Sequence, residues 1–286
     1  MYIGTSNAKF VVIDGQARIP PADNATHRSR AARRPVSSRN TTADRAIDLL
    51  LLFNDNRRVV TAAEVANDLG TSRSATYRYL QSLKTYGLLE DDPNGFRLGP
   101  TILELARLAR KGFGLSEIAL PIMREMVAAT NETVLLTRRH YDRVVTLERE
   151  EPARTTIRLS YERGQVLPIH AGASAKVLIA FADEAEIDRI LAAAPLRRFT
   201  SKTVTDPARL RVELDEIRAL GFARSYGELD EGVVGIGAPI FQRGDVVAGL
   251  SVAAVQFRST KADISRMTDL VCRSAQEISN RIARVD

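Results

Sequence analysis

The chain has 286 residues, which is long enough for two domains with a core each. Its apolar fraction of 44% and charged fraction of 27% are ordinary for a soluble globular protein. The single cysteine, Cys272, excludes an internal disulfide and a zinc site built from several cysteines, and it favours the cytoplasm. No apolar run reaches the roughly 20 residues of a membrane helix, and residues 1–20 lack the pattern of a signal peptide.

The net charge of +6 is concentrated at the N-terminus. Residues 1–43 carry seven basic and two acidic side chains, whereas residues 44–110 carry nine of each sign. The overall charge is therefore no evidence for a basic DNA-binding domain. Residues 1–43 are predicted to be a basic, mostly disordered extension, either a solvated tail or an arm that contacts phosphates. A strand-like pattern at residues 9–13 has no obvious partner.

Residues 44–100 are predicted to form a helix-turn-helix domain with a β-hairpin wing. Thr61 and Glu64 have the spacing of a capping box at a helix start, and Gly70 can adopt the left-handed conformation that ends a helix. The predicted elements are helices over 44–53, 62–69 and 72–86, followed by strands over 88–90 and 96–98.

The helix over 72–86 has a polar, cationic outer face. No acidic residue occurs between positions 71 and 89, while Arg73, Arg78 and Lys84 are positive. Donors and acceptors of different reach on one helix suit the base edges and phosphates of a major groove. Such a face can also be merely solvated, but the order helix, turn, helix and wing favours DNA binding. The predicted DNA contacts are Ser72, Arg73, Ser74, Thr76, Tyr77, Arg78 and Gln81, with Asn94 and Arg97 of the wing.

The rest of the chain is predicted to be a helical linker and an α+β domain. Residues 101–115 have the length and apolar character of a linker or dimerisation helix. Residues 116–286 mix both periodicities and predict an antiparallel sheet with helices packed over it. The predicted helices cover 116–129, 173–182, 184–193, 207–220 and 262–283, and the predicted strands cover 133–139, 144–150, 155–159, 222–226, 235–241 and 246–255.

Several of these motifs resemble the IclR family of bacterial transcriptional regulators. Residues 44–50 resemble the family's opening helix, and residues 71–83 its recognition helix. In the second domain, residues 167–176, 226–228 and 232–240 resemble the effector-domain signatures. The resemblance covers about residues 42–286. It implies a winged helix-turn-helix domain, a helical linker and a GAF-like effector domain. It also implies a homodimer or homotetramer on operator DNA, which controls an operon, often a catabolic one, in response to an organic acid or aromatic metabolite.

The resemblance further implies effector contacts at Ala171, Gly172, Ala173, Ser174, Ser225, Tyr226, Glu228, Gly235, Ser251 and Ala253. Gly235 stands where a side chain such as cysteine often occurs, and Ala253 where a hydroxyl is frequent. Loss of these groups is expected to favour a bulkier or more apolar effector than a two- or three-carbon acid. No cofactor, metal or membrane partner is expected.

Two other functions are compatible with parts of the sequence. Catalysis is less favoured because the three histidines are far apart in sequence, His170 suits a structural hydrogen bond, and Cys272 lies within an amphipathic helix. The glycines between positions 232 and 237 fail the spacing of a nucleotide loop. The chain is therefore predicted not to be an enzyme. The second interpretation, a DNA-binding protein whose C-terminal domain only dimerises, stays open because nothing in the sequence identifies a ligand.

Overall fold

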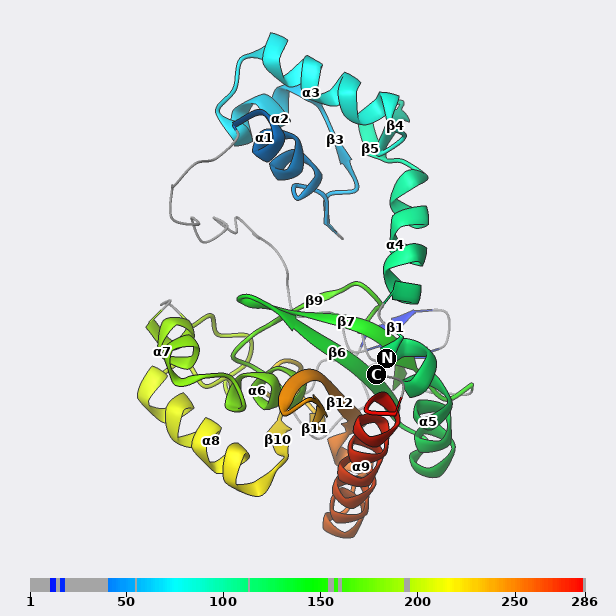
Figure 1. The fold of residues 1–286 in the computed structure, drawn as a ribbon, viewed down its shortest axis with the longest axis vertical. Helices are drawn as coiled ribbons and strands as arrows, with labels where there is room; N and C mark the ends of the chain where they lie inside the picture. The colour runs from blue at the N-terminus through cyan, green and yellow to red at the C-terminus, as the bar shows by residue number, and fades with distance from the viewer. Residues whose placement is uncertain are drawn as a thin grey trace. The chain divides into compact units, whose positions relative to one another are not determined.

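The computed structural model describes residues 11–13, 16–18, 41–54, 56–112, 114–153, 157–158, 161–192 and 196–284. The chain forms two compact units, one of residues Asp23–Phe113 and one of Met1–Ala22 together with Gly114–Asp286. Figure 1 labels the helices and strands of both. Within the described ranges, no helix is long and apolar enough to cross a membrane.

The smaller unit is the predicted winged helix-turn-helix. Its three-stranded sheet has the order β3-β5-β4, and the first of these strands was not predicted. Helix α1 begins and ends three residues earlier than the pattern indicated. The elements are α1 (Thr41–Leu50), β3 (Val59–Val60), α2 (Ala62–Leu69), α3 (Arg73–Thr85), β4 (Leu89–Asp92), β5 (Gly95–Leu98) and α4 (Thr101–Gly112).

Local hydrogen bonds fix the turn between α2 and α3. The Thr61 side chain accepts from the Glu64 backbone N–H, and the Glu64 carboxylate accepts in return from Thr61, so the predicted capping box is confirmed. Gly70 ends α2 with φ of 60°, a conformation that favours glycine. Leu49, Val65, Leu69, Leu80, Leu83 and Leu89 form the core beneath. This packing sets the angle at which α3 is held.

The larger unit contains a six-stranded, fully antiparallel sheet of order β10-β11-β12-β6-β7-β9. The predicted α+β class and antiparallel sheet are confirmed, and the three-residue strand β9 was not predicted. The strands are β6 (Thr133–His140), β7 (Arg143–Glu150), β9 (Val166–Pro168), β10 (Ala223–Tyr226), β11 (Val233–Gln242) and β12 (Asp245–Val255). The helices are α5 (Leu115–Thr130), α6 (Ala173–Ala180), α7 (Glu184–Ala192), α8 (Pro207–Leu220) and α9 (Lys261–Ile282), with a 3-10 turn, η1 (Gln256–Arg258), before the last.

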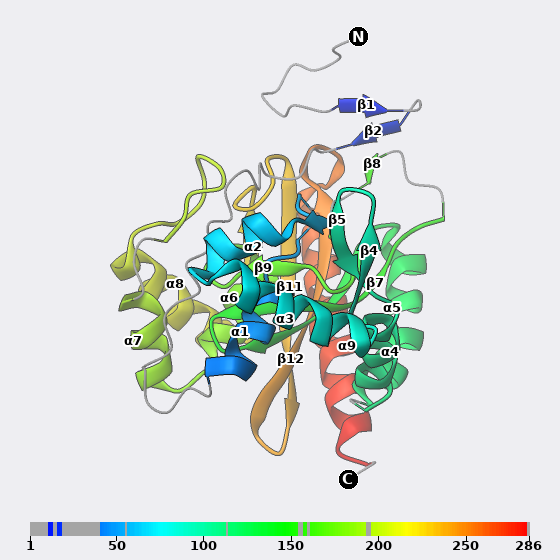
Figure 2. The ribbon, with the colours of Figure 1, turned by 90° about the horizontal axis from the view of Figure 1, so that it is seen from above.

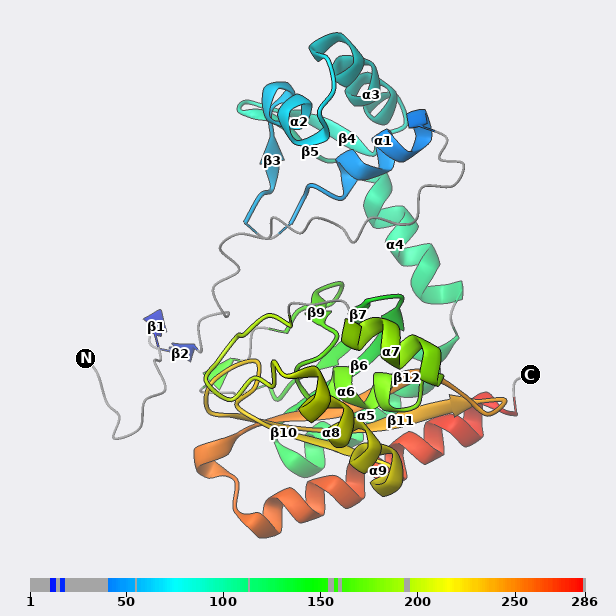
Figure 3. The same ribbon diagram turned by 90° about the vertical axis from the view of Figure 1, so that its left-hand side faces the viewer.

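Helices cover both faces of this sheet, and Figure 2 shows α6, α7 and α8 on one side of the strands and α5 and α9 on the other. The division follows from the alternation of side chains along a strand. Val234, Ile236 and Ile240 of β11 pack against α5 and α9, whereas Val233 of the same strand packs toward α6. The hairpin of β11 and β12 runs along α9 (Figure 3). The sheet therefore has two separate cores.

Two short strands precede the winged helix-turn-helix in sequence. Strand β1 (Val11–Ile13) pairs antiparallel with β2 (Gln16–Arg18), and β2 pairs in parallel with β8 (Ile157–Arg158). The strand-like pattern at residues 9–13 thus has a partner that its sequence did not reveal. Most of the segment predicted to be disordered falls outside the described residues, as do three of the five positions of the strand predicted over 155–159.

Candidate DNA-binding and ligand-binding sites

The outer face of α3 is exposed and carries two arginines. Arg73, Arg78, Tyr77 and Gln81 all lie on it, and the Tyr77 side chain is 51% exposed. Ser72 caps the helix by accepting a hydrogen bond from the Ala75 N–H. Among the described residues, neither Arg73 nor Arg78 forms an ion pair. The two guanidinium groups are therefore available to an external anion or base.

Thr76 corrects the prediction for this face, because its side chain is fully buried. Its hydroxyl donates to the Ser72 carbonyl at 3.1 Å and lies 2.8 Å from the Thr71 hydroxyl. Thr76 lies on the same buried face of α3 as Leu80 and Leu83, which follow it at helical spacing. Thr76 therefore bonds the start of α3 to the turn before it, and its buried side chain is not available to DNA in this conformation.

The wing is acidic. Strands β4 and β5 and their turn contain three acidic residues and one basic residue, Arg97. The Arg97 guanidinium is 2.7 Å from the Glu90 carboxylate, and Asp91 is paired at 2.6 Å with Lys84 of α3. Asn94 lies exposed in the turn, where its N–H donates to the Asp92 side chain. Phosphate contact through Arg97 therefore requires its ion pair with Glu90 to break or to be shared.

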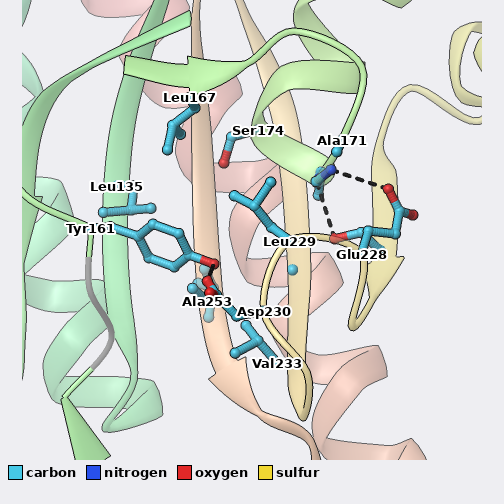
Figure 4. A pocket seen from close by; sticks show the side chains of 15 residues that line it. Leu135, Tyr161, Leu167, Ala171, Ser174, Glu228, Leu229, Asp230, Val233 and Ala253 are labelled. Carbon is cyan, nitrogen blue, oxygen red and sulfur yellow. Dashed lines mark hydrogen bonds between the residues drawn. The ribbon is translucent and has the colours of Figure 1, made fainter. Parts of the chain in front are cut away.

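The larger unit contains a cavity between the sheet and the start of α6 (Figure 4). The space open to the centre of a water molecule is about 30 Å³, which suffices for about one or two waters. This volume does not favour the bulkier effector that the sequence led us to expect, unless the surrounding loops open. The cavity is lined by Leu135, Tyr161, Leu167, Ala171, Gly172, Ala173, Ser174, Ser225, Glu228, Leu229, Asp230, Val233, Gly235, Val252 and Ala253.

Glycines let α6 approach the sheet closely. A Cβ atom at Gly237 would lie 3.1 Å from the Ala173 carbonyl oxygen, and one at Gly235 would lie 2.6 Å from the Ser225 hydroxyl. Gly249 of β12 is similarly covered by Val177 and Thr137. Side chains at these positions would push the helix start away from the strands. Close packing of α6 therefore explains the glycines of β11 that do not fit a nucleotide loop.

The first backbone N–H groups of α6 are bonded to side chains from the loop and strand opposite. The Gly172 N–H donates to Glu228 Oε2 and the Ala173 N–H to Ser225 Oγ, each at 3.1 Å. Glu228 Oε1 lies 2.5 Å from Nζ of the buried Lys176, which also reaches Glu213 of α8 at 3.0 Å. These bonds hold α6, α8 and the loop before β11 together around the buried ion pair of Lys176 and Glu228.

Tyr161 and Asp230 face one another across the cavity. The Tyr161 hydroxyl donates to Asp230 Oδ2 at 2.5 Å, and Figure 4 shows the hydroxyl end of the ring directed toward that carboxylate. Burial, and then the neighbouring carboxylate, raise the pKa of Tyr161 well above 10, so the phenol stays protonated. At the same end of α6, His170 Nε2 is 2.9 Å from the Arg197 carbonyl, and burial lowers the pKa of His170.

The structure brings most of the expected effector residues to the cavity. Tyr226 is an exception, because the alternation of β10 buries Ser225 and leaves Tyr226 40% exposed, away from the lining. Ser251 is buried behind the lining, with its hydroxyl 2.7 Å from that of Ser174. Two further lining residues, Tyr161 and Asp230, were not predicted as ligand contacts.

The fold and these two sites define a class: a transcriptional regulator with a winged helix-turn-helix and an α+β domain that contains a small cavity. The model for "Bacterial transcriptional regulator IclR C-terminal" matches residues 109–280, and that for "IclR helix-turn-helix domain" matches residues 42–93. The chain belongs to the IclR family of bacterial transcriptional regulators.

The chain is similar to individual members of this family over most of its length. The sequence is 31% identical to the HTH-type transcriptional regulator KipR of Bacillus subtilis, over 86% of this chain and 99% of KipR. It is 35% identical to the HTH-type transcriptional regulator BhcR of Paracoccus denitrificans, over 82% and 85% of the two chains. A crystal structure of an IclR homolog from Microbacterium hydrocarbonoxydans, complexed with 4-hydroxybenzoate, is similar with a TM-score of 0.74 and 26% identity, over 86% and 100% of the chains.

Proposed function

We propose that the protein places α3 in successive major grooves of a pseudo-palindromic operator and controls the adjacent operon. The observation that carries this proposal is the pair of exposed guanidinium groups of Arg73 and Arg78 on an acid-free helix, which form no ion pair with any residue that the structure describes. An Arg can bond two acceptors of a guanine edge at once, or neutralise a phosphate. Ser72, Ser74, Tyr77 and Gln81 are proposed to assist, and Asn94 and Arg97 to reach the backbone from the wing. Such a regulator acts in the bacterial cytoplasm, where the DNA lies.

We propose further that the protein acts as a homodimer or homotetramer. Helix α4 supports this, because Leu103, Leu105 and Leu108 are 74%, 51% and 53% exposed. Three large apolar side chains on one helix are costly to leave in water. A second copy that covers them would pair two copies of α3, which is what a two-fold operator requires.

We propose that the cavity beside α6 binds a small organic molecule, a metabolite of a catabolic pathway, and that this binding alters the affinity of the protein for its operator. Ligand-bound crystals of an IclR homolog support a site in this fold, and the convergence of hydroxyls and carboxylates on an otherwise apolar cavity supports it in this chain. A C-terminal domain that only dimerises would have no need of such a cavity. We propose no enzymatic role.

Binding-site selection from a random duplex library tests the DNA-binding part. The expected result is a pseudo-palindrome with half-sites about one helical turn, or a multiple of it, apart. Titration of metabolites against that duplex, followed by fluorescence anisotropy, tests the sensing part. A sensor changes its operator affinity with ligand, and by linkage the ligand then binds the DNA complex with a correspondingly changed affinity. A domain that only dimerises gives the same anisotropy curve with every compound.

A further inference from the structure

One wall of the cavity beside α6 is a loop. Residues 227–232 join β10 to β11, and they supply three lining residues, Glu228, Leu229 and Asp230. Figure 4 shows these three in succession between Ala171, before α6, and the ring of Tyr161. The cavity of about 30 Å³ holds only one or two waters. An organic ligand of the kind proposed above can therefore enter only if a wall moves.

The other walls are held by continuous packing. Strands β11 and β12 pair along most of their length, and nearly every residue of α6 is buried. Moving either would expose apolar surface, at a cost of about 25 cal/mol for each Å². The loop of residues 227–232 has much less surface in the core, since Leu229 is its one partly buried apolar residue there. The loop is therefore the wall that costs least to move.

A glycine stands at each end of this loop. Gly227 has φ of 64° and Gly232 has φ of 77°, both in the left-handed region that favours glycine. The Gly227 N–H donates to the Val233 carbonyl, and the Gly232 carbonyl accepts from the Gln256 N–H, each at 2.7 Å. These two bonds fix the ends of the loop to the sheet. The segment between them can rotate about the two glycines, as hinged loops do.

Two threonines of the connection between α7 and α8 hold the backbone of this loop. The Thr203 hydroxyl donates to the Glu228 carbonyl at 2.7 Å, and the Thr200 hydroxyl donates to the Gly227 carbonyl at 2.6 Å. Both threonines are buried, although neither lines the cavity. The Thr203 hydroxyl also accepts from the backbone N–H groups of Phe199 and Thr200, which fixes its orientation.

Side chains of the loop complete its attachment to the rest of the cavity. The Glu228 carboxylate accepts from the Gly172 N–H and pairs with Lys176. If Glu228 moves outward, Lys176 keeps its ion pair with Glu213 at 3.0 Å, so the buried ammonium group does not lose its last partner. The loop is thus held largely by hydrogen bonds, and water can replace these when the loop moves outward.

We infer that residues 227–232 form a gate that opens to admit the ligand, and that Thr200 and Thr203 are the latch that holds it shut. The inference rests on the proposed sensing function of the cavity and specifies how its site is reached. Both threonines are positioning residues, because they act through the backbone of the gate. Loss of a latch hydroxyl should favour the open state and leave the pairing of the strands unchanged.

Labelling of a cysteine in the cavity measures this opening without a known ligand. The reference protein is the full chain with Ala253→Cys, at a lining position that is 5% exposed, and Cys272→Ser, which removes the native thiol. Its reaction with methyl methanethiolsulfonate, a small uncharged reagent, is followed by mass spectrometry. Three further variants of this protein carry Thr203→Val, which removes the hydroxyl, Thr203→Ser, which retains it, or Thr205→Val. Thr205 lies in the same connection, and its hydroxyl accepts from Arg198, so its variant is the matched control.

We expect Thr203→Val to be labelled at least about tenfold faster than the reference, a change of about 1.4 kcal/mol in the opening equilibrium. Thr203→Ser and Thr205→Val should stay within about threefold of the reference. The rate should depend only weakly on urea, because local opening exposes little surface. An unchanged rate in Thr203→Val overturns the inference, as does a rate that depends on urea as steeply as global unfolding does. A reference cysteine that reacts as fast as a short peptide thiol would show that no gate closes the cavity.

Circular dichroism checks that each variant folds, and hydrogen exchange of the unmodified chain replaces the labelling if Thr203→Val does not. The Gly172 N–H donates to the gate carboxylate, so it should exchange through an opening of lower free energy than the amides of β11. Equal protection of Gly172 and β11 would overturn the inference. Neither measurement needs a ligand, so the gate can fail while the operator titration still shows sensing, and sensing can fail while the gate opens as described.

Discussion

The close approach of α6 to the sheet makes Gly235→Ala a sharp test of how the cavity is built. A methyl group at this position would lie 2.6 Å from the Ser225 hydroxyl and 3.3 Å from Ala173 Cβ. The serine must rotate, and its hydroxyl then no longer accepts from the Ala173 N–H. Crowding of this kind costs about 1–3 kcal/mol, and the lost hydrogen bond about 1 kcal/mol more. The free energy of unfolding of the larger unit should fall by about 2–4 kcal/mol.

A double-mutant cycle separates this cause from general crowding. Ser225→Ala alone should destabilise by about 1–3 kcal/mol, since it leaves a buried N–H without an acceptor. In the Ser225→Ala background the clashing oxygen is gone, so Gly235→Ala should cost only about 1 kcal/mol, which gives a coupling energy of about 1–3 kcal/mol. Urea unfolding followed by circular dichroism and tyrosine fluorescence suits a chain without tryptophan. If Gly235→Ala costs the same in both backgrounds, the contact with Ser225 is not what requires a glycine.

Three further predictions concern the DNA-binding unit and the pH dependence. Thr76→Val removes a buried hydroxyl and its hydrogen bond to the Ser72 carbonyl, so it should lower the unfolding midpoint of the smaller unit and leave the base preference unchanged. A new preferred sequence in binding-site selection would show that Thr76 contacts DNA. Glu90→Gln should free Arg97 and remove a negative charge from the wing, so operator affinity should rise several-fold at about 0.1 M salt; an unchanged affinity by anisotropy would place the wing away from the DNA. Burial lowers the pKa of His170 below its ordinary 6.5. The stabilising contribution of the neutral imidazole is therefore fully present above pH 6.5, and it is lost as the pH falls toward the lowered pKa. His170→Asn should flatten this part of the plot of unfolding free energy against pH, and an equally steep plot for the variant would assign the loss to another group.

The elements that were predicted well have strong local signals. Helix α8 begins and ends at the predicted residues because Asp206 caps its start, Pro207 follows, and Gly221 ends it with φ of 77°. The two shortest strands of the domain sheets, β3 and β9, were missed. Each has two or three residues, and each exists because a strand distant in sequence supplies its hydrogen bonds. Local pattern carries no information about such a partner.

The sites were predictable to the extent that they follow from periodicity. The helical period places Arg73, Tyr77 and Arg78 on the exposed face of α3, as predicted, and it also explains why Thr76 is buried. In the cavity, a shift of one position along β10 separates the lining Ser225 from the exposed Tyr226. Tyr161 was missed because a loop residue has no periodic pattern, and only the folded chain brings it to Asp230.

The salt dependence of operator binding tests the account's central claim most directly, because it reports how many phosphates the exposed face of α3 neutralises. The affinity of the selected duplex is measured from about 0.05 to 0.3 M salt for the wild type and for Arg73→Gln with Arg78→Gln. A charge-matched double control, Arg209→Gln with Arg266→Gln, removes two exposed arginines of α8 and α9. We expect the double variant to bind at least about tenfold more weakly, with either a slope reduced by about 0.9 for each lost phosphate contact or a relaxed base preference, and the control to behave as the wild type. Wild-type affinity, slope and base preference in the double variant would contradict the claim that α3 binds the DNA.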